Sequence, residues 1–133
     1  MPALSFKTQF IPLIESGEKR QTIRARKRPI KVGERLYLYT GMRTKNCRKI
    51  AELICTKTHN FLISKYQVDL YPRAWIDGEL ICSEHLKELA IRDGFKEVED
   101  FTHFFLTSPK AQTESCVTSF SGQLIKWGIL CKP

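Results

Sequence analysis

The sequence lacks any apolar run long enough to cross a membrane and any tract that would divide it into parts. No stretch approaches the roughly 18 consecutive apolar residues that span a bilayer, so we expect no membrane partner. The 133 residues also contain no internal repeat, no low-complexity segment and no linker rich in Pro, Gly or Ser. Because 42% of the residues are hydrophobic, the chain can bury one sizeable core. We therefore predict a single globular domain over residues 1–133.

The cysteines lack the spacing that would indicate a disulfide framework or a zinc site. The five cysteines are an odd number without C-x-x-C spacing, and no secretory leader precedes them, so we expect reduced thiols and a cytoplasmic location. Cys82, His85 and His103 supply only three unevenly spaced ligands. A Gly-rich loop that would cradle a nucleotide is also missing. We therefore predict no metal ion and no cofactor.

Acidic residues are nearly absent from the first part of the chain. Residues 1–50 contain 13 Lys and Arg but only 3 Asp and Glu, whereas residues 51–133 contain 9 and 11. A positive field confined to one region attracts polyanions, so RNA leads the predicted partners. Two other interpretations stay open. The charge can serve solubility alone, or it can bind anionic membrane, although no long amphipathic helix carries the cations.

Hydrophobic spacing predicts a helix followed by strands in the basic region. A short helix is expected over Phe10–Gly17, with Gly17 as its stop. A strand at Thr22–Arg24 would point Ile23 inward and bring Thr22 and Arg24 together on the other face. After a turn at residues 31–34, a further strand over residues 35–39 alternates cleanly.

The rest of the chain predicts more strands and two helices. Strands are expected at Lys49–Thr58, Phe61–Tyr66 and Phe120–Leu130, with a hairpin turn at Asp77-Gly78. A helix capped by Ser83 would stop at Gly94, and phenylalanines spaced three or four residues apart predict another helix from residue 98. Residues 109–115 are expected to form an exposed loop. Together these elements predict a mostly antiparallel β domain with three short helices.

One motif connects the first helix to the first strand. Residues 17–24 read Gly-Glu-Lys-Arg-Gln-Thr-Ile-Arg, a G-x-K-x-x-T-x-R pattern that resembles the signature of the ASCH domain family, relatives of the PUA fold. Residues 32–36, 89–95 and 120–127 are similar to family segments in the same order, the last of them to the final strand of phage-type members. The resemblance implies an α+β fold, a PUA-like and mostly antiparallel β-barrel, with a cleft between the motif and residues 89–95.

The resemblance also implies a function. Family members bind RNA, and some act on RNA or on modified nucleosides. Small bacterial members that are amidohydrolases remove the acetyl group from N(4)-acetylcytidine with the motif's lysine and threonine and a carboxylate. These positions correspond to Lys19, Thr22 and Asp93 of this chain, where the amidohydrolases carry Glu in place of Asp93.

The chemistry of these side chains fits such a reaction. A positive field from Arg20 and Arg24 disfavours protonated Lys19, which could then accept a proton from a nucleophilic Thr22. Asp93 could orient the lysine, hold the substrate amine or donate a proton, while Arg24 faces an oxyanion or phosphate. In the structural alternative, Arg24 pairs with Asp93, Thr22 bonds to backbone and Lys19 is solvated.

A second set of residues predicts contact with single-stranded RNA. Tyr39 at a strand end offers a flat surface to an unstacked base, and Arg43 and Lys49 can hold phosphates. In a ribonuclease, Lys45 could stabilise the pentavalent phosphate, and Tyr39 or Ser121 could exchange protons with the 2′-hydroxyl or the leaving oxygen. Alternatively, the tyrosine packs on the barrel and the loop is merely solvated.

The run of cations after the motif, Arg26, Lys27 and Arg28, is dense enough to bind phosphates beside Arg20 and Arg24, although such runs are often solvated loops. We therefore predict an RNA-binding ASCH domain. Its first predicted activity is that of a ribonuclease on single-stranded RNA, and the second is N(4)-acetylcytidine amidohydrolysis. A binding module without catalysis is the alternative from another class.

Overall fold

The computed structural model describes residues 2–128. The strands are β1 (Ala3–Phe6), β2 (Gln21–Arg24), β3 (Arg35–Thr40), β4 (Arg48–Tyr66), β5 (Arg73–Ile76), β6 (Glu79–Leu80), β7 (Gln112–Glu114) and β8 (Val117–Trp127). The helices are the 3₁₀ turn η1 (Thr8–Phe10), which runs into α1 (Ile11–Ser16), and then α2 (Ser83–Arg92) and α3 (Val98–Leu106). Within these residues, no helix has both the length and the apolar character needed to cross a bilayer.

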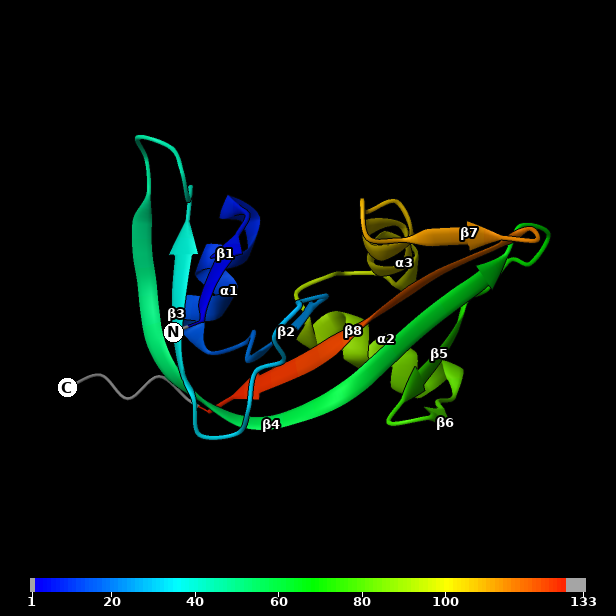
Figure 1. Cartoon of the computed structure of the whole chain (residues 1–133), viewed down its shortest axis with the longest axis horizontal. Helices are drawn as coiled ribbons and strands as arrows, with labels where there is room; N and C mark the ends of the chain where they lie inside the picture. The colour runs from blue at the N-terminus through cyan, green and yellow to red at the C-terminus, as the bar shows by residue number, and fades with distance from the viewer. Residues whose placement is uncertain (1, 129–133) are drawn as a thin grey trace.

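The sheet is organised around β4, which is 19 residues long. Its first part pairs antiparallel with β3, and the remainder pairs with β8 and β5. Register shifts between Cys55 and Lys57 mark an irregularity at which the strand can bend. In Figure 1, β4 sweeps from one side of the molecule to the other, so that the sheet forms a strongly curled half-barrel. The predicted α+β fold with a barrel-like, mostly antiparallel sheet and three short helices is confirmed.

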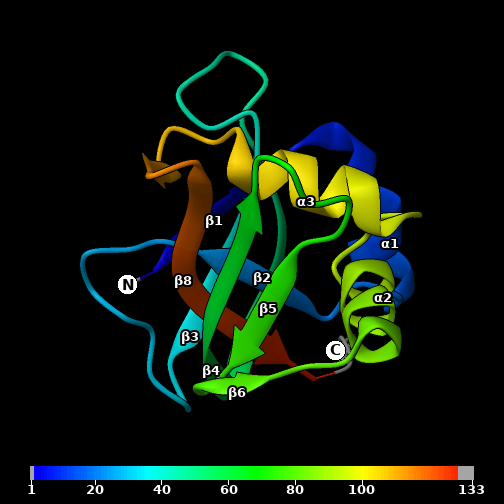
Figure 2. The same cartoon turned by 90° about the vertical axis from the view of Figure 1, so that its right-hand side faces the viewer.

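The curl divides the molecule into two arms. The first arm holds β1, β3, α1 and the start of β4, and the second holds β5, β6, β7, α3 and the end of β4 (Figure 1). Between the arms, β2 pairs antiparallel with β8. Among the strands of residues 2–128, β1 and β3 are the one parallel pair. In Figure 2, α1 and α2 lie to the right of the strands, and α3 crosses the upper part of the view.

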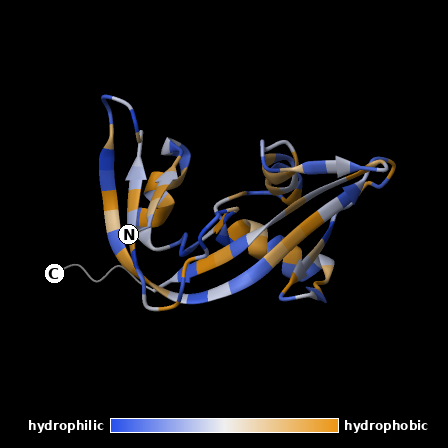
Figure 3. Ribbon diagram, viewed as in Figure 1, coloured by the Kyte–Doolittle hydropathy of each residue, from blue (hydrophilic) through white to orange (hydrophobic). Residues whose placement is uncertain are grey.

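Alternation of apolar and polar residues explains which strand faces are buried. Along β3, Leu36 and Leu38 are fully buried, as predicted. Apolar and polar bands also alternate along β4 and β8 (Figure 3). Phe101 and Phe105 of α3 pack against Phe61 of β4 with ring centroids 6.0 and 6.1 Å apart, and Phe105 also contacts Phe120 of β8. These contacts fix α3 to the sheet.

Three details of the predicted fold are wrong. The two strands predicted around residue 60 are one strand, because β8 pairs with β4 continuously from Lys57 to Tyr66. Ser83 is the first residue of α2 and not its cap, since the extended backbone lies at Cys82 and no side chain caps the helix. Part of the predicted loop at 109–115 is the short exposed strand β7, which pairs with β8. Residues 129 and 130 of the predicted last strand lie outside the described residues.

Candidate active site

The sharp end of α1 places Lys19 inside the molecule. Gly17 ends the helix with φ +85°, a conformation that glycine adopts without a steric penalty. The Lys19 backbone N–H then donates to the Leu13 carbonyl at 2.9 Å, and β2 begins two residues later. The Lys19 side chain is therefore 3% exposed, and the prediction that it could be solvated is wrong.

Asp93 reaches the same place from the end of α2. Its backbone N–H donates to the Leu89 carbonyl at 3.0 Å, which keeps it on the last turn of the helix. The Gln21 amide of β2 donates to the same carbonyl at 3.4 Å, so α2 and β2 are joined directly. Gly94 follows with φ +98°, and a Cβ there would lie 2.8 Å from the Phe10 ring and 3.3 Å from Lys19 Cδ. Only glycine lets the chain turn this close to the lysine.

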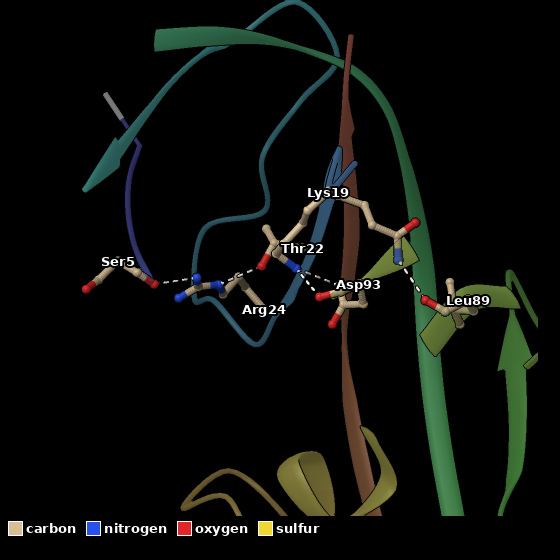
Figure 4. A network of polar contacts seen from close by, with 7 residues as sticks. Ser5, Lys19, Thr22, Arg24, Leu89 and Asp93 are labelled. Atoms are coloured by element: carbon tan, nitrogen blue, oxygen red, sulfur yellow. Dashed lines mark hydrogen bonds and ion pairs between the residues drawn. The ribbon is translucent and has the colours of Figure 1, made fainter. Parts of the chain in front are cut away.

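Lys19 and Asp93 form a buried ion pair. Lys19 Nζ lies 3.3 Å from Asp93 Oδ1 and also donates to the Asp93 backbone carbonyl (Figure 4). Burial lowers the pKa of Lys19, and the attraction of Asp93 opposes that shift. Burial likewise raises the pKa of Asp93, against the attraction of Lys19. Desolvation thus disfavours both charges and eases proton transfer from Lys19 to Asp93, which would leave a base next to an acid.

Thr22 and Arg24 lie beside this pair on β2. Arg24 Nε donates to Thr22 Oγ1 at 3.0 Å, and another guanidinium nitrogen donates to the Ser5 carbonyl (Figure 4). The predicted neighbourhood of Thr22 and Arg24 is confirmed, whereas the alternative pairing of Arg24 with Asp93 is not found. Burial lowers the pKa of Arg24 to about 10, so the guanidinium stays charged at neutral pH. Because Thr22 Oγ1 accepts from Arg24, its own hydrogen remains to be donated.

A hollow of about 290 Å³ lies beside these side chains, and we call it the lysine hollow. Lys19, Thr22, Arg24 and Asp93 line it together with residues of β1 on the first arm and α3 on the second. Its other walls are largely aromatic: five phenylalanines line it, Phe6, Phe10, Phe95, Phe104 and Phe105, together with Ser5, Lys7 and Ile23. At the rim, the Lys7 ammonium of the first arm lies 5.1 Å from the centroid of the Phe104 ring. The hollow is therefore a polar floor between aromatic walls.

The residues of the predicted ribonuclease set lie on different arms. Tyr39 is near the end of β3, paired with Lys49, and Lys45 is in the exposed loop between β3 and β4. Ser121 is on β8 opposite Leu62, near the other end of β4. The structure does not bring Tyr39, Lys45 and Ser121 together as one catalytic set.

The predicted phosphate-binding cations are also divided. Arg43 is exposed in the same loop as Lys45, and Lys49 makes an ion pair with Glu52. Arg20 is exposed, and its Nε donates to the Gly17 carbonyl at 2.7 Å. Arg26, Lys27 and Arg28 are exposed in the segment that follows β2. Of these predicted cations, Arg24 lines the lysine hollow, and Arg26 and Lys27 line a second hollow described below.

Sequence reasoning missed the walls of the hollow. The spacing of the phenylalanines in α3 predicts a helix but not that Phe104 and Phe105 line the hollow, while Phe101 lies in the core. Lys7 carried no signal, because a single lysine after a strand is common on protein surfaces. Cys47, Cys55, Cys82 and Cys116 are free thiols, and Cys131 lies outside the described residues. No group of three or more His, Cys, Asp or Glu side chains in residues 2–128 is arranged to hold a metal ion.

Comparison with known proteins gave no match: no family model fits the sequence, and no curated protein or solved structure is significantly similar to the chain.

Proposed function

We propose that this chain is an ASCH-type domain that binds RNA, or a nucleoside derived from it, and hydrolyses an acyl amide on the base. N(4)-acetylcytidine is the substrate that this chemistry suggests. One observation supports the proposal above the others. Lys19 and Thr22 of the motif and Asp93 at the end of α2, which the family resemblance marks as reactive, come from two distant segments and line one hollow.

The size and walls of the lysine hollow favour a single base as ligand. Its volume of about 290 Å³ is at the lower end of the range of about 300–1,000 Å³ for small-molecule sites. Phenylalanine rings on its walls can stack on a flat heterocycle. A stretch of polymer would not fit inside, so the strand itself must lie elsewhere on the surface.

The floor supplies groups for each step of amide hydrolysis. Thr22 Oγ attacks the acyl carbon while its proton passes to neutral Lys19, and the carbonyl electrons move onto an oxygen that faces Arg24. The C–N bond then breaks as the leaving amine takes a proton from Asp93, which Lys19 reprotonates. A water molecule, deprotonated by Lys19, attacks the threonine ester. The acid is released, and Thr22 recovers its proton.

Hydrolysis of N(4)-acetylcytidine, followed by chromatography of cytidine, tests the proposal. We expect Thr22→Val to lower the rate by about 100-fold or more, as for loss of a positioned reacting group. Thr22→Ser keeps the hydroxyl and should retain much of the activity. Lys87→Ala, which removes an exposed lysine on α2, is the matched control. Equal rates for Thr22→Val and the wild-type protein would contradict the proposal.

Ribonuclease activity stays a prediction that the same preparations can test. Labelled single-stranded RNA is incubated with the wild-type protein and with Tyr39→Phe, Lys45→Ala and Ser121→Ala. Cleavage that is lost in these variants, and kept in Thr22→Val, would support a ribonuclease. RNA retained on a filter without cleavage or deacetylation would indicate a binding module.

A further inference from the structure

A second hollow adjoins the lysine hollow and is strongly basic. It has a volume of about 390 Å³, and we call it the inner basic hollow. Its cationic lining residues are Arg24, Arg26, Lys27 and Lys110, and no acidic side chain lines it. The remaining lining includes the polar side chains of Asn60 and Ser121. Lys110 comes from the segment between α3 and β7, so two distant parts of the chain supply the charge.

A third hollow continues from the second. This outer basic hollow has a volume of about 720 Å³ and five cationic lining residues against the single acid Glu34. Arg26, Lys27 and Pro29 line both basic hollows, and Arg24 lines both the inner basic hollow and the lysine hollow. The three hollows are therefore neighbours linked by shared lining residues, and we call this series the path, with the aromatic site at one end.

The cations of this path are available to an anion. Among residues 2–128, no ion pair engages Arg26, Lys27 or Lys110. By contrast, Lys49 pairs with Glu52 and Arg48 pairs with Glu15. Three unpaired cations around one concave surface create a field that favours phosphate groups spaced along a chain.

We infer that the lysine hollow takes its base from a nucleotide within a single strand of RNA, whose phosphates lie in the two basic hollows. The inference deepens the proposed function and rests on it only for the reaction at the base. A base in the lysine hollow leaves its sugar at the rim. Arg24 lines both this hollow and the inner basic hollow, so the phosphates next to that sugar would lie toward the basic hollows. The strand must be single because a base stacked in a duplex cannot enter a hollow without leaving its pair. The polymer is thus the preferred substrate over the free nucleoside.

Fluorescence anisotropy with a labelled single-stranded RNA that contains one N(4)-acetylcytidine tests the inference. Lys110→Ala should weaken binding several-fold and reduce the slope of log affinity against log salt by about 0.7, the value for one phosphate contact on a single strand. Lys110 is exposed, so its loss should leave the fold intact. Lys87→Ala removes the same charge on α2, away from the path, and should leave the affinity unchanged.

Free N(4)-acetylcytidine separates the inference from the proposed function. If both hold, the RNA is deacetylated with a lower KM than the nucleoside, and Lys110→Ala raises KM for the RNA alone. If neither substrate is deacetylated, the proposed function fails, while anisotropy still reports on the path. Equal losses in Lys110→Ala and Lys87→Ala would overturn the inference even where deacetylation is observed. Binding of a matched duplex as tightly as the single strand would overturn it as well.

Discussion

At the scale of single residues, the account depends on a lysine and a carboxylate that are both removed from water. A buried ion pair contributes little net stability, because desolvation offsets the attraction, but removing one partner leaves a buried unpaired charge. The Lys19–Asp93 pair is therefore expected at this position for its chemistry. Phe10 adds a cation–π contact to the lysine, because its ring centroid lies 4.9 Å from the Lys19 ammonium.

Lys19→Met should lower the free energy of unfolding by about 3–5 kcal/mol near neutral pH, the usual cost of breaking a buried pair. Urea denaturation measures this loss. Adding Asp93→Asn should restore a large part of it, because the uncompensated carboxylate is then gone. An equal loss in the single and the double variant would contradict this interpretation.

The loss in Lys19→Met should also depend on pH, and its sign follows from the carboxyl. Burial raises the folded-state pKa of Asp93 above that of the unfolded chain, so the folded state holds the extra proton. Stability due to this group is then greatest below the ordinary carboxyl pKa of about 3.9 and falls as pH rises above it. We expect a smaller deficit at pH 4 than at pH 7. A deficit that does not change with pH would contradict a buried carboxylate.

The sequence predicted that the motif and Asp93 border one cleft, but not what lowers the pKa of Lys19. Lys19, Thr22 and Arg24 follow from the motif, and the period of two along a strand correctly predicts Thr22 beside Arg24. The lowered pKa of Lys19 was attributed to its cationic neighbours. In the structure, burial is the main cause, and Arg24 contributes least. Burial depends on how α1, α2 and β2 pack against one another. Local sequence patterns do not predict that packing.

At the scale of elements, the site is assembled where two helices end. Lys19 follows the end of α1, and Asp93 follows the end of α2. Each helix is followed by a glycine with positive φ, at Gly17 and Gly94. Sequence reasoning predicted both helix ends from these glycines. It divided β4 in two because it could not see the long pairing with β8 that carries the strand through His59 and Asn60.

Gly94→Ala tests how closely the turn after α2 approaches the lysine. Its φ of +98° costs an alanine about 1–3 kcal/mol, and crowding against Phe10 should add about 1–3 kcal/mol. Gly33→Ala is the matched control, because Gly33 has φ +93° but open space around its Cβ position. Thermal or urea denaturation should show a larger loss in Gly94→Ala. Equal losses would mean that the contact with Phe10 is unimportant.

Deacetylation should distinguish the same two glycine variants. Because an added methyl group at Gly94 would also crowd Lys19 Cδ at 3.3 Å, Gly94→Ala should lose activity even at temperatures where it stays folded. Gly33→Ala, in the turn before β3, should keep its activity. Full activity in folded Gly94→Ala would contradict a catalytic role for the lysine at this turn.

At the scale of the whole molecule, the curl of β4 is the decisive feature. It places β1 of the first arm opposite α3 of the second, and the lysine hollow has walls from both. The charge difference between the two parts of the chain predicts a basic surface. However, Lys110 comes from the part of the chain with net negative charge, and only the fold brings it to Arg26 and Lys27. Curvature and distant contacts of this kind are set by packing of the whole sheet.

The location of the ligand tests the central claim most directly. Backbone amide signals of the wild-type protein are recorded by nuclear magnetic resonance during a titration with cytidine, the product of the proposed reaction. The account predicts that the largest shifts occur at Thr22, Asp93 and Gly94, while the loop over residues 41–47 is unchanged. Shifts concentrated in that loop, or no shifts around the lysine hollow, would contradict it.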